Sequence, residues 1–438
     1  MLNGLFVFVA LVSILTAAFT GGMEALTDSV LSSARNAIEL AFGLIGVMAF
    51  FLGLMRVLSD SGLMASLARV VSPVMKLLFP SIPAASPAMS AMILNIAANM
   101  MGLANAATPF GIKAITELNK LNSKKGTATN DMVLFLAINT AGLAVLPSGM
   151  IAIRAALGST NASGIFLTTW FASGCATAVG ITAALLLARL PRYRASEPTL
   201  FNQEHSPIHQ SREELAVDTL EGHTDPAPPS SPRRLLLWLF WVVFLVGASI
   251  TFLDRIKTEQ GSDVFREMTS YWLLPAIIAG ALLYGWSRRT PVYDALVDGA
   301  KEGFDVAIRI IPYLVAILVA VGMFRACGAL EILTGVLAPL TSLIGMPAEA
   351  LPMALLRPLT GSGALGIASE AMTSHGPDSL IGYMVSTYQG STETTFYVLA
   401  LYFGVARIKN GRHALPACLL ADIAGVLGAV WACHLLLN

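Results

Sequence analysis

The most constraining feature of this sequence is a series of long apolar segments. A helix needs roughly 20 apolar residues to cross the hydrocarbon core of a bilayer, which is about 30 Å thick. The clearest segments of this length are 3–20, 36–58, 131–152, 164–189, 234–253, 270–287, 303–326 and 413–437. Two more, 87–107 and 379–405, have spanning length but are interrupted by polar residues. The pattern predicts an all-α polytopic membrane protein with about ten membrane segments.

The composition agrees with this prediction. Of the 438 residues, 55% are hydrophobic and only 12% are charged, whereas soluble domains carry about 25% charged residues. The 27 basic and 27 acidic residues balance, so the charge indicates no nucleic-acid partner. Because no basic residue precedes Leu5, we interpret 3–20 as a retained first span and not as a secretory signal.

Residues 191–233 differ sharply from the rest of the chain. They are rich in Pro, Ser, Glu and His, and such a segment cannot bury enough apolar surface to fold alone. The sequence therefore predicts a disordered cytoplasmic linker between two membrane domains, 1–190 and 234–438. His205 and His209 lie four apart in this linker, but without a third ligand we interpret them as solvated. The four cysteines lie singly in apolar segments, so neither a metal nor a cofactor is predicted.

The two membrane domains share an order of motifs. GLMR at 53–56 corresponds to GMFR at 322–325, and each is followed by a glycine and a proline spaced eleven residues apart. These pairs are Gly62 with Pro73 and Gly328 with Pro339. We interpret the halves as distant copies, because internal repeats are common in transporters. Two plain spans separate the copies, and this even number of crossings predicts that both copies have the same orientation. Segments 60–79 and 328–345 are expected to lie at or dip into the membrane interface.

The interrupted segment of the first half contains a run of amides. Its polar residues, in order, are Asn95, Asn99, Asn105 and Thr108. Asn95, Asn99 and Gly102 have the spacing of one helical face, and the helix is expected to stop or unwind at Pro109 and Gly111. Asparagines also join helices by hydrogen bonds, so helix packing and a role in lining a solute or ion site both stay open. Asn139 and Thr140 belong to the span that follows.

The second half contains a glycine-rich break, RPLTGSGALG, at 357–366. Its GxGxxG spacing is typical of dinucleotide folds, but a membrane segment lacks the strand that this motif needs. We interpret it as a broken membrane helix, in which Arg357 either anchors at the interface or faces an anion or a carboxylate. Next, HGPDS at 375–379 is interpreted as a turn in which Asp378 or Ser379 caps the following helix.

The stretch YQGSTETTFY at 388–397 places a carboxylate between two apolar runs. Gln389 and Glu393 have i and i+4 spacing, with Thr392 beside them. An ionised carboxylate at the centre of a membrane helix costs about 2.5–3.5 kcal/mol on insertion scales. We therefore expect that a cation, with Arg357 as one candidate, pairs with Glu393, or that Glu393 titrates, binds a cation or accepts hydrogen bonds from a substrate. Glu370 and Asp422 are secondary candidates of the same kind.

Several of these motifs resemble a known family. NIAANMMGLANAATPFGIKA and FLAINTAGLAVLPSGMIAIRAA resemble spore maturation protein A, whereas RPLTGSGALG, HGPDSLIG and QGSTETTFYVLALYFG resemble spore maturation protein B. The likeness covers 1–190 and about 270–438, as in a fusion of the two. Both families belong to the nucleoside-recognition, or Gate, group, which is similar to parts of concentrative nucleoside transporters and of the ferrous iron transporter B. The resemblance implies a transporter-type membrane protein and names no substrate.

Our first hypothesis is therefore a secondary transporter or permease in the cell inner membrane that takes a small polar solute. Its partners are the bilayer, the solute and a coupling cation, and the sequence leaves a homo-oligomer open. The predicted binding residues are Asn95, Asn99, Asn105, Asn139, Arg357, Ser362, Gln389, Thr392 and Glu393. The alternatives are a non-transporting envelope scaffold and an intramembrane enzyme using His375 and Glu393. Since no P-loop is present, uphill transport would need an ion gradient or another protein.

Overall fold

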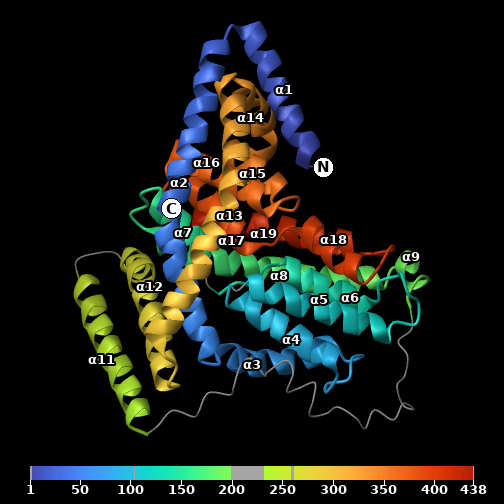
Figure 1. Ribbon diagram of the computed structural model, residues 1–438, viewed down its shortest axis with the longest axis vertical. Helices are drawn as coiled ribbons and strands as arrows, with labels where there is room; N and C mark the ends of the chain where they lie inside the picture. The colour runs from blue at the N-terminus through green and yellow to red at the C-terminus, as the bar shows by residue number, and fades with distance from the viewer. Residues whose placement is uncertain (1, 103, 146, 199–230, 258–260, 438) are drawn as a thin grey trace.

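The computed structural model in Figure 1 describes the chain except for residues 1, 103, 146, 199–230, 258–260 and 438. The part of the chain that it describes is helical and contains no strand, only one isolated bridge between Thr127 and Asn410. The all-α fold predicted from the apolar segments is confirmed. Most of the predicted linker, 199–230, lies outside the described residues.

The helices of the first half vary widely in length. They are α1 (Leu2–Thr20), α2 (Met23–Asp60), α3 (Leu63–Leu78), α4 (Pro87–Met100), α5 (Ala104–Leu121), α6 (Asn130–Thr140), α7 (Ser148–Ala156), the short η1 (Ala162–Ile165), α8 (Phe166–Ala188) and α9 (Pro191–Arg194). The prediction of an unbroken span over 131–152 is wrong, because the chain unwinds between α6 and α7. Polar Asn139 and Thr140 end α6, and Gly142 with its positive φ of 58° continues the break.

The second half follows the same plan. Its helices are α11 (Ser231–Arg255), α12 (Gly261–Ser287), α13 (Val292–Ala326), α14 (Ala329–Ser342), the short η2 (Ala348–Ala350), α15 (Leu351–Leu356), α16 (Gly361–His375), α17 (Leu380–Ser391), α18 (Thr395–Val405) and α19 (Ala414–Leu437). Four described helices are long and apolar enough to cross a membrane: Met23–Asp60, Ala162–Ala188, Leu235–Arg255 and Ala414–Leu437. A bent pair, Leu314–Ala326 with Ala329–Pro339, makes a fifth if it is one span.

The repeated motifs occupy equivalent places in the two halves. Gly62 precedes α3 with φ +78°, and Gly328 precedes α14 with φ +79°. Glycine adopts this left-handed backbone without the steric cost that other residues meet. Each glycine turns the chain from a long helix into a shorter one that contains its repeated proline, Pro73 or Pro339. The two pseudo-repeats with broken helices are confirmed.

The prediction that both copies have the same orientation is wrong. Gly53 of α2 contacts Leu296 of α13, Ala49 contacts Gly303, and Ser33 contacts Gly322, so the two helices run antiparallel (Figure 1). The reason lies in segment 87–107, which makes one arm of a hairpin and no separate crossing. In that hairpin the Asn95 amide reaches the carbonyl oxygen of Ala107. With one crossing fewer between them, equivalent helices of the two copies become antiparallel, as in inverted-repeat transporters.

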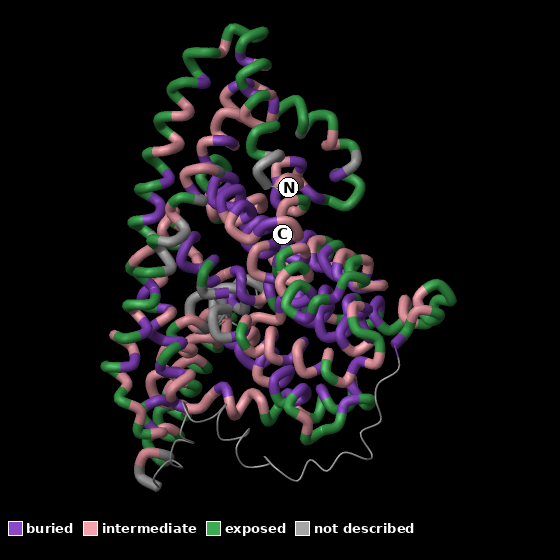
Figure 2. The backbone as a smooth tube through the Cα atoms, turned by 45° about the vertical axis from the view of Figure 1, so that its right-hand side comes forward, coloured by how far each residue is buried: buried purple, intermediate pink, exposed green. Residues whose placement is uncertain are grey.

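The two halves share their cores. One buried cluster combines residues of α2 and α7 with residues of α16 and α17, and the other combines α4, α5 and α6 with α18 and α19. Figure 2 shows that buried residues concentrate in the middle of the molecule. Outer helix α11 instead exposes large apolar side chains, including Trp238 at 69%, as a helix in contact with lipid would. The division into 1–190, 191–233 and 234–438 stays a prediction.

Candidate functional site

The candidate site forms where two helix breaks meet, one from each half. The first break connects α6 to α7, and the second, Thr392–Thr394, connects α17 to α18. Thr129 caps α6 and Ser379 caps α17, each with a side-chain oxygen that accepts a backbone N–H. Equivalent caps therefore start the two helices that carry the breaks. The predicted capping of α17 by Ser379 is confirmed.

The two breaks are in direct contact. The backbone N–H of Glu393 donates to the carbonyl oxygen of Thr140 at 2.8 Å. A Cβ placed on Gly142 would lie 2.9 Å from the carbonyl carbon of Thr392. A residue with a side chain would therefore not fit at Gly142 without moving the opposite break. Irregular backbone inside a membrane protein is tolerated only where protein or a water-lined cavity satisfies it.

Amide side chains of the first half form one network beside the breaks. The Asn99 amide donates to Asn139 Oδ1 at 2.8 Å, and the Asn139 amide donates to Asn95 Oδ1 at 2.7 Å. The Asn95 amide in turn donates to the carbonyl oxygen of Ala107 at 2.7 Å and lies 3.5 Å from the Tyr402 hydroxyl of the second half. The structure thus brings together three of the four predicted asparagines. Asn105 lies in the first turn of α5, and its side chain lies outside the described residues.

The predicted position of the first hairpin break is wrong. The helix was expected to stop at Pro109 and Gly111, but α5 continues through both residues. The chain turns instead near Gly102, whose φ is +73°, so Gly102 does not share a helical face with Asn95 and Asn99. Pro109 is the sixth residue of α5, so it lies inside the helix and removes one backbone hydrogen bond there without ending the helix.

Arg357 holds the second break in place. It follows α15 and is 5% exposed. Its guanidinium donates to the carbonyl oxygen of Gln389 at 3.1 Å, to that of Thr392, and to Thr394 Oγ1 at 3.2 Å. Charged donors thus satisfy carbonyl oxygens that the end of α17 leaves without helical partners. The sequence left two roles open for Arg357, an anchor at the interface and a partner for an anion or a carboxylate. Because Arg357 is buried, the role of an interfacial anchor does not fit.

Glu393 is positioned differently from the prediction. It lies in the break and not on a helix with Gln389, because α17 ends at Ser391. Its carboxylate lies 3.8 Å from the Arg357 guanidinium, and its side chain is 48% exposed. The expected pairing of Glu393 with Arg357 is present, although the distance of 3.8 Å is long for an ion pair. The expected burial at a helix centre is wrong, because the break leaves the Glu393 side chain half-exposed.

Several buried polar atoms around the breaks have no hydrogen-bond partner within the described part of the chain. They are Thr169 Oγ1, Gln389 Oε1, Ser391 Oγ and Asp422 Oδ1. An unsatisfied buried polar atom costs about 1–3 kcal/mol, so these four atoms retain unused hydrogen-bonding capacity beside the breaks. Thr392 Oγ1 bonds the Tyr388 carbonyl oxygen at 3.3 Å, and Ser362 lies half-buried in the first turn of α16.

Asp422 and Thr395 form a polar pair that lay outside the predicted residue set. Thr395 begins α18 directly after the break, and its hydroxyl donates to Asp422 Oδ2 at 2.7 Å. Asp422 belongs to α19 and is 4% exposed. The sequence signal for Asp422 was that a carboxylate occurs within an apolar run. The sequence did not indicate which break Asp422 would contact. Glu370, the other secondary candidate, lies elsewhere on α16, paired with Arg325.

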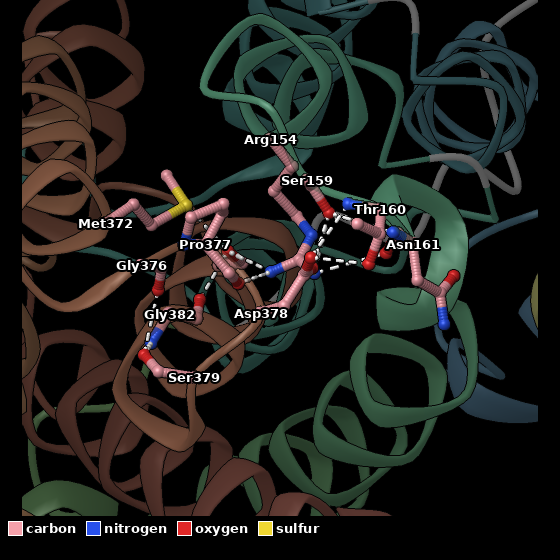
Figure 3. Close-up of polar contacts among 11 residues, drawn as sticks. Arg154, Ser159, Thr160, Asn161, Met372, Gly376, Pro377, Asp378, Ser379 and Gly382 are labelled. Carbon is pink, nitrogen blue, oxygen red and sulfur yellow. Dashed lines mark hydrogen bonds and ion pairs between the residues drawn. The ribbon is translucent and has the colours of Figure 1, made fainter.

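A second polar group joins the halves away from the breaks (Figure 3). Arg154 is fully buried and donates to Asp378 Oδ1 at 2.9 Å and to the carbonyl oxygens of Pro377 and Asn161 at 2.5 and 3.1 Å. Asp378 also accepts from the backbone N–H of Thr160 at 2.7 Å. The turn predicted at 375–379 is confirmed, but Asp378 pairs with the first half and does not cap α17.

Replacing Gly142 by alanine is expected to force the two breaks apart. The new Cβ would overlap the backbone of Thr392, and overpacking costs about 1–3 kcal/mol in addition to the strain of a positive φ. Gly158→Ala is the matched control, because Gly158 has φ +78° with no atom within 4 Å of its Cβ position. Thermal unfolding of the purified variants measures the difference. Equal loss of stability in both would contradict the close contact of the breaks.

Comparison with known proteins agrees with this architecture. The sequence profile of the Gate family, described as nucleoside recognition, matches residues 41–160 and 307–409, together just over half of the chain. These two stretches contain α4 to α7 and α15 to α18, the helices that carry the breaks. The chain is an α-helical membrane protein, and it belongs to the Gate family.

Two relatives from Bacillus subtilis each match part of the chain. Spore maturation protein B is 49% identical over 36% of this chain and 89% of its own length. Spore maturation protein A is 38% identical over 38% of this chain and 84% of its own length. The predicted resemblance to a fusion of these two families is confirmed. Among solved structures, the YdaH transporter of Alcanivorax borkumensis aligns over 98% of this chain and 97% of its own, with TM-score 0.43 and 15% identity.

Proposed function

We propose that this chain is a secondary transporter or permease that moves a small polar solute through a site between its two Gate-like halves. The observation that carries the proposal is the contact of two unwound segments, surrounded by buried polar atoms that have no hydrogen-bond partner among the described residues. Broken helices that meet between inverted repeats are the usual architecture of solute sites in secondary transporters. The location that we propose is the cell inner membrane, with several crossings.

In this proposal the two halves contribute different chemistry. The amides of Asn95, Asn99, Asn105 and Asn139 orient the solute from the first half. Arg357 keeps the second break open. Ser362, Gln389 and Thr392 offer hydrogen-bonding groups to the solute from the second half. Glu393 is the coupling group, because its carboxylate is half-exposed in the break and is accessible to a small cation. Nucleosides, amino acids and inorganic ions are all small enough to be candidates.

Glu393→Gln tests the coupling role. Purified protein is first screened for thermal stabilisation by uridine, alanine, succinate and metal ions, because a ligand of the folded state raises its stability. Uptake of the stabilising compound is then measured in liposomes with and without a sodium or proton gradient. We expect the variant to bind the compound and to lose the dependence of uptake on the gradient. Glu349→Gln, in η2 and outside the breaks, is the control.

Unchanged gradient-driven uptake in Glu393→Gln would exclude the coupling role.

A second candidate function is a non-transporting envelope scaffold of the spore maturation type, favoured by the identity to the two Bacillus subtilis proteins. It predicts no flux, no stabilisation by solutes and stable co-purifying proteins. A catalytic role for His375 and Glu393 has little support, because His375 ends α16, whereas Glu393 lies in the second break, which contacts the opposite end of α16 at Gly361.

A further inference from the structure

A separate cavity of about 550 Å³ lies where the ends of α3 and α8 meet the start of α6 and the short α9. Its volume falls within the range of small-molecule sites, about 300–1,000 Å³. The segment Ala162–Ala188, which contains α8, is long and apolar enough to cross a membrane, so the cavity at its end lies at the level of the lipid head groups. None of the lining residues belongs to the two breaks or to the amide network. The cavity is therefore distinct from the proposed solute site.

Two arginines of the lining, Arg189 and Arg194, are available to a ligand. Neither guanidinium bonds a carboxylate or another side chain among the described residues. The backbone N–H of Arg194 donates to the carbonyl oxygen of Leu190 at 2.9 Å. One helical turn and one peptide unit thus separate the two arginine Cα atoms, a distance of about 10 Å at most. Because the planar fork of a guanidinium matches a phosphate, the two side chains can hold one phosphate between them.

Two carboxylates of the same lining lie close to each other. Ser81 Oγ donates to Asp131 Oδ1 at 2.7 Å, and the Asn130 amide donates to Glu197 Oε1. Arg412 fixes this amide by donating to Asn130 Oδ1 at 2.8 Å. Glu197 repels the Asp131 carboxylate, and no cation in the described part of the chain lies within ion-pair distance of either. An ammonium group, with its positive charge and three N–H donors, would relieve this repulsion.

Apolar side chains connect the cavity with the lipid. Leu77 at the end of α3 is 81% exposed, and Leu185 of α8 is 45% exposed, and both line the cavity. Exposed leucines at this level are positioned to contact acyl chains. The two cations and two carboxylates of the lining balance, so the cavity fits a zwitterionic head group better than an anionic one.

We propose that this cavity binds a phospholipid whose head group carries a primary ammonium group, as phosphatidylethanolamine does. The two arginines contact the phosphate, and the two carboxylates accept the N–H bonds of the ammonium group. Leu77 and Leu185 contact an acyl chain. Phosphatidylcholine has no N–H donors, and phosphatidylglycerol has no cation for the carboxylates. Both of these lipids therefore match only part of the cavity.

The test uses purified, delipidated full-length protein in a neutral detergent, titrated with the three lipids carrying identical acyl chains. Native mass spectrometry is expected to show one phosphatidylethanolamine bound saturably, with the other two lipids bound about tenfold more weakly or less, because charge-assisted hydrogen bonds are lost. Asp131→Asn combined with Glu197→Gln is expected to abolish this preference. The matched control combines Asp294→Asn with Glu24→Gln, in the first turns of α13 and α2 and outside the cavity, and is expected to keep the preference.

The arginines are tested by Arg189→Gln combined with Arg194→Gln. This variant is expected to bind all three lipids about tenfold more weakly, because each of them carries the phosphate. Arg35→Gln, an exposed arginine of α2 outside the cavity, is expected to bind all three normally.

Equal binding of phosphatidylethanolamine and phosphatidylcholine by the unchanged protein would overturn the proposal, whether or not the variants fold. An unchanged lipid preference in a carboxylate variant with a normal unfolding temperature would overturn it as well. Glycerophosphoethanolamine, which has the head group without acyl chains, is expected not to raise the unfolding temperature, and stabilisation equal to that by the lipid would assign the site to a soluble ligand instead. Asn139→Leu is expected to leave lipid binding unchanged, so this test is independent of the proposed transport.

Discussion

Replacing Arg154 by methionine is expected to lower the free energy of unfolding by about 3 kcal/mol, a large fraction of the stability of a typical protein. Methionine keeps the length of the side chain but leaves Asp378 without its cation and two carbonyl oxygens without their donor. Removing one partner of a buried ion pair costs about 3–5 kcal/mol, and we expect the lower end because Asp378 is 32% exposed. Chemical denaturation in detergent micelles measures the change.

Two further variants make this prediction specific. Arg35→Met, an exposed arginine of α2, is expected to change stability by less than about 0.5 kcal/mol. The double variant Arg154→Met with Asp378→Asn is expected to be less destabilised than the sum of the single variants, because the stranded carboxylate is gone. A loss below about 1 kcal/mol in Arg154→Met would mean that this group does not hold the halves together.

Arg357→Met is expected to reduce solute uptake about a hundredfold while the protein still inserts into liposomes. The change removes the donors for the carbonyl oxygens of Gln389 and Thr392. Two hydrogen bonds to a charged group, at about 1.5 kcal/mol each, correspond to two factors of ten. The measurement is the initial rate of uptake, per folded protein, of the compound that stabilises the unchanged chain.

The matched control for Arg357 is Arg412→Met. Arg412 also donates to backbone carbonyl oxygens, those of Ala128 at 3.2 Å and Tyr193 at 2.5 Å, but it lies outside the breaks. We expect Arg412→Met to lose stability and to keep its uptake rate per folded protein. Arg357→Lys is expected to restore uptake only in part, since an ammonium group lacks the planar fork of a guanidinium. Equal uptake in Arg357→Met and Arg412→Met would contradict the role of Arg357.

The sequence located the polar positions better than it described their surroundings. The spacing of Asn95 and Asn99 predicted one helical face, because helical periodicity is a local property of the chain. The hydrogen bonds of both residues to Asn139 joined two segments about forty residues apart, which no local pattern contains. Glu393 shows the limit of such reasoning. Its spacing from Gln389 matched a helix, but carbonyl oxygens bound by Arg357 stabilise an extended break there instead.

The sequence by itself determined the class of this protein: an all-α membrane protein of the Gate family, built from two copies, with the second break marked by the polar stretch at 388–397. Apolar length, repeated motifs and family resemblance are all properties of the linear chain. Only the tertiary structure decided that the copies are inverted, that 87–107 is one arm of a hairpin and that the two breaks touch. These features depend on contacts between segments far apart in the chain. One hairpin in place of a membrane crossing reverses the orientation of every helix that follows it.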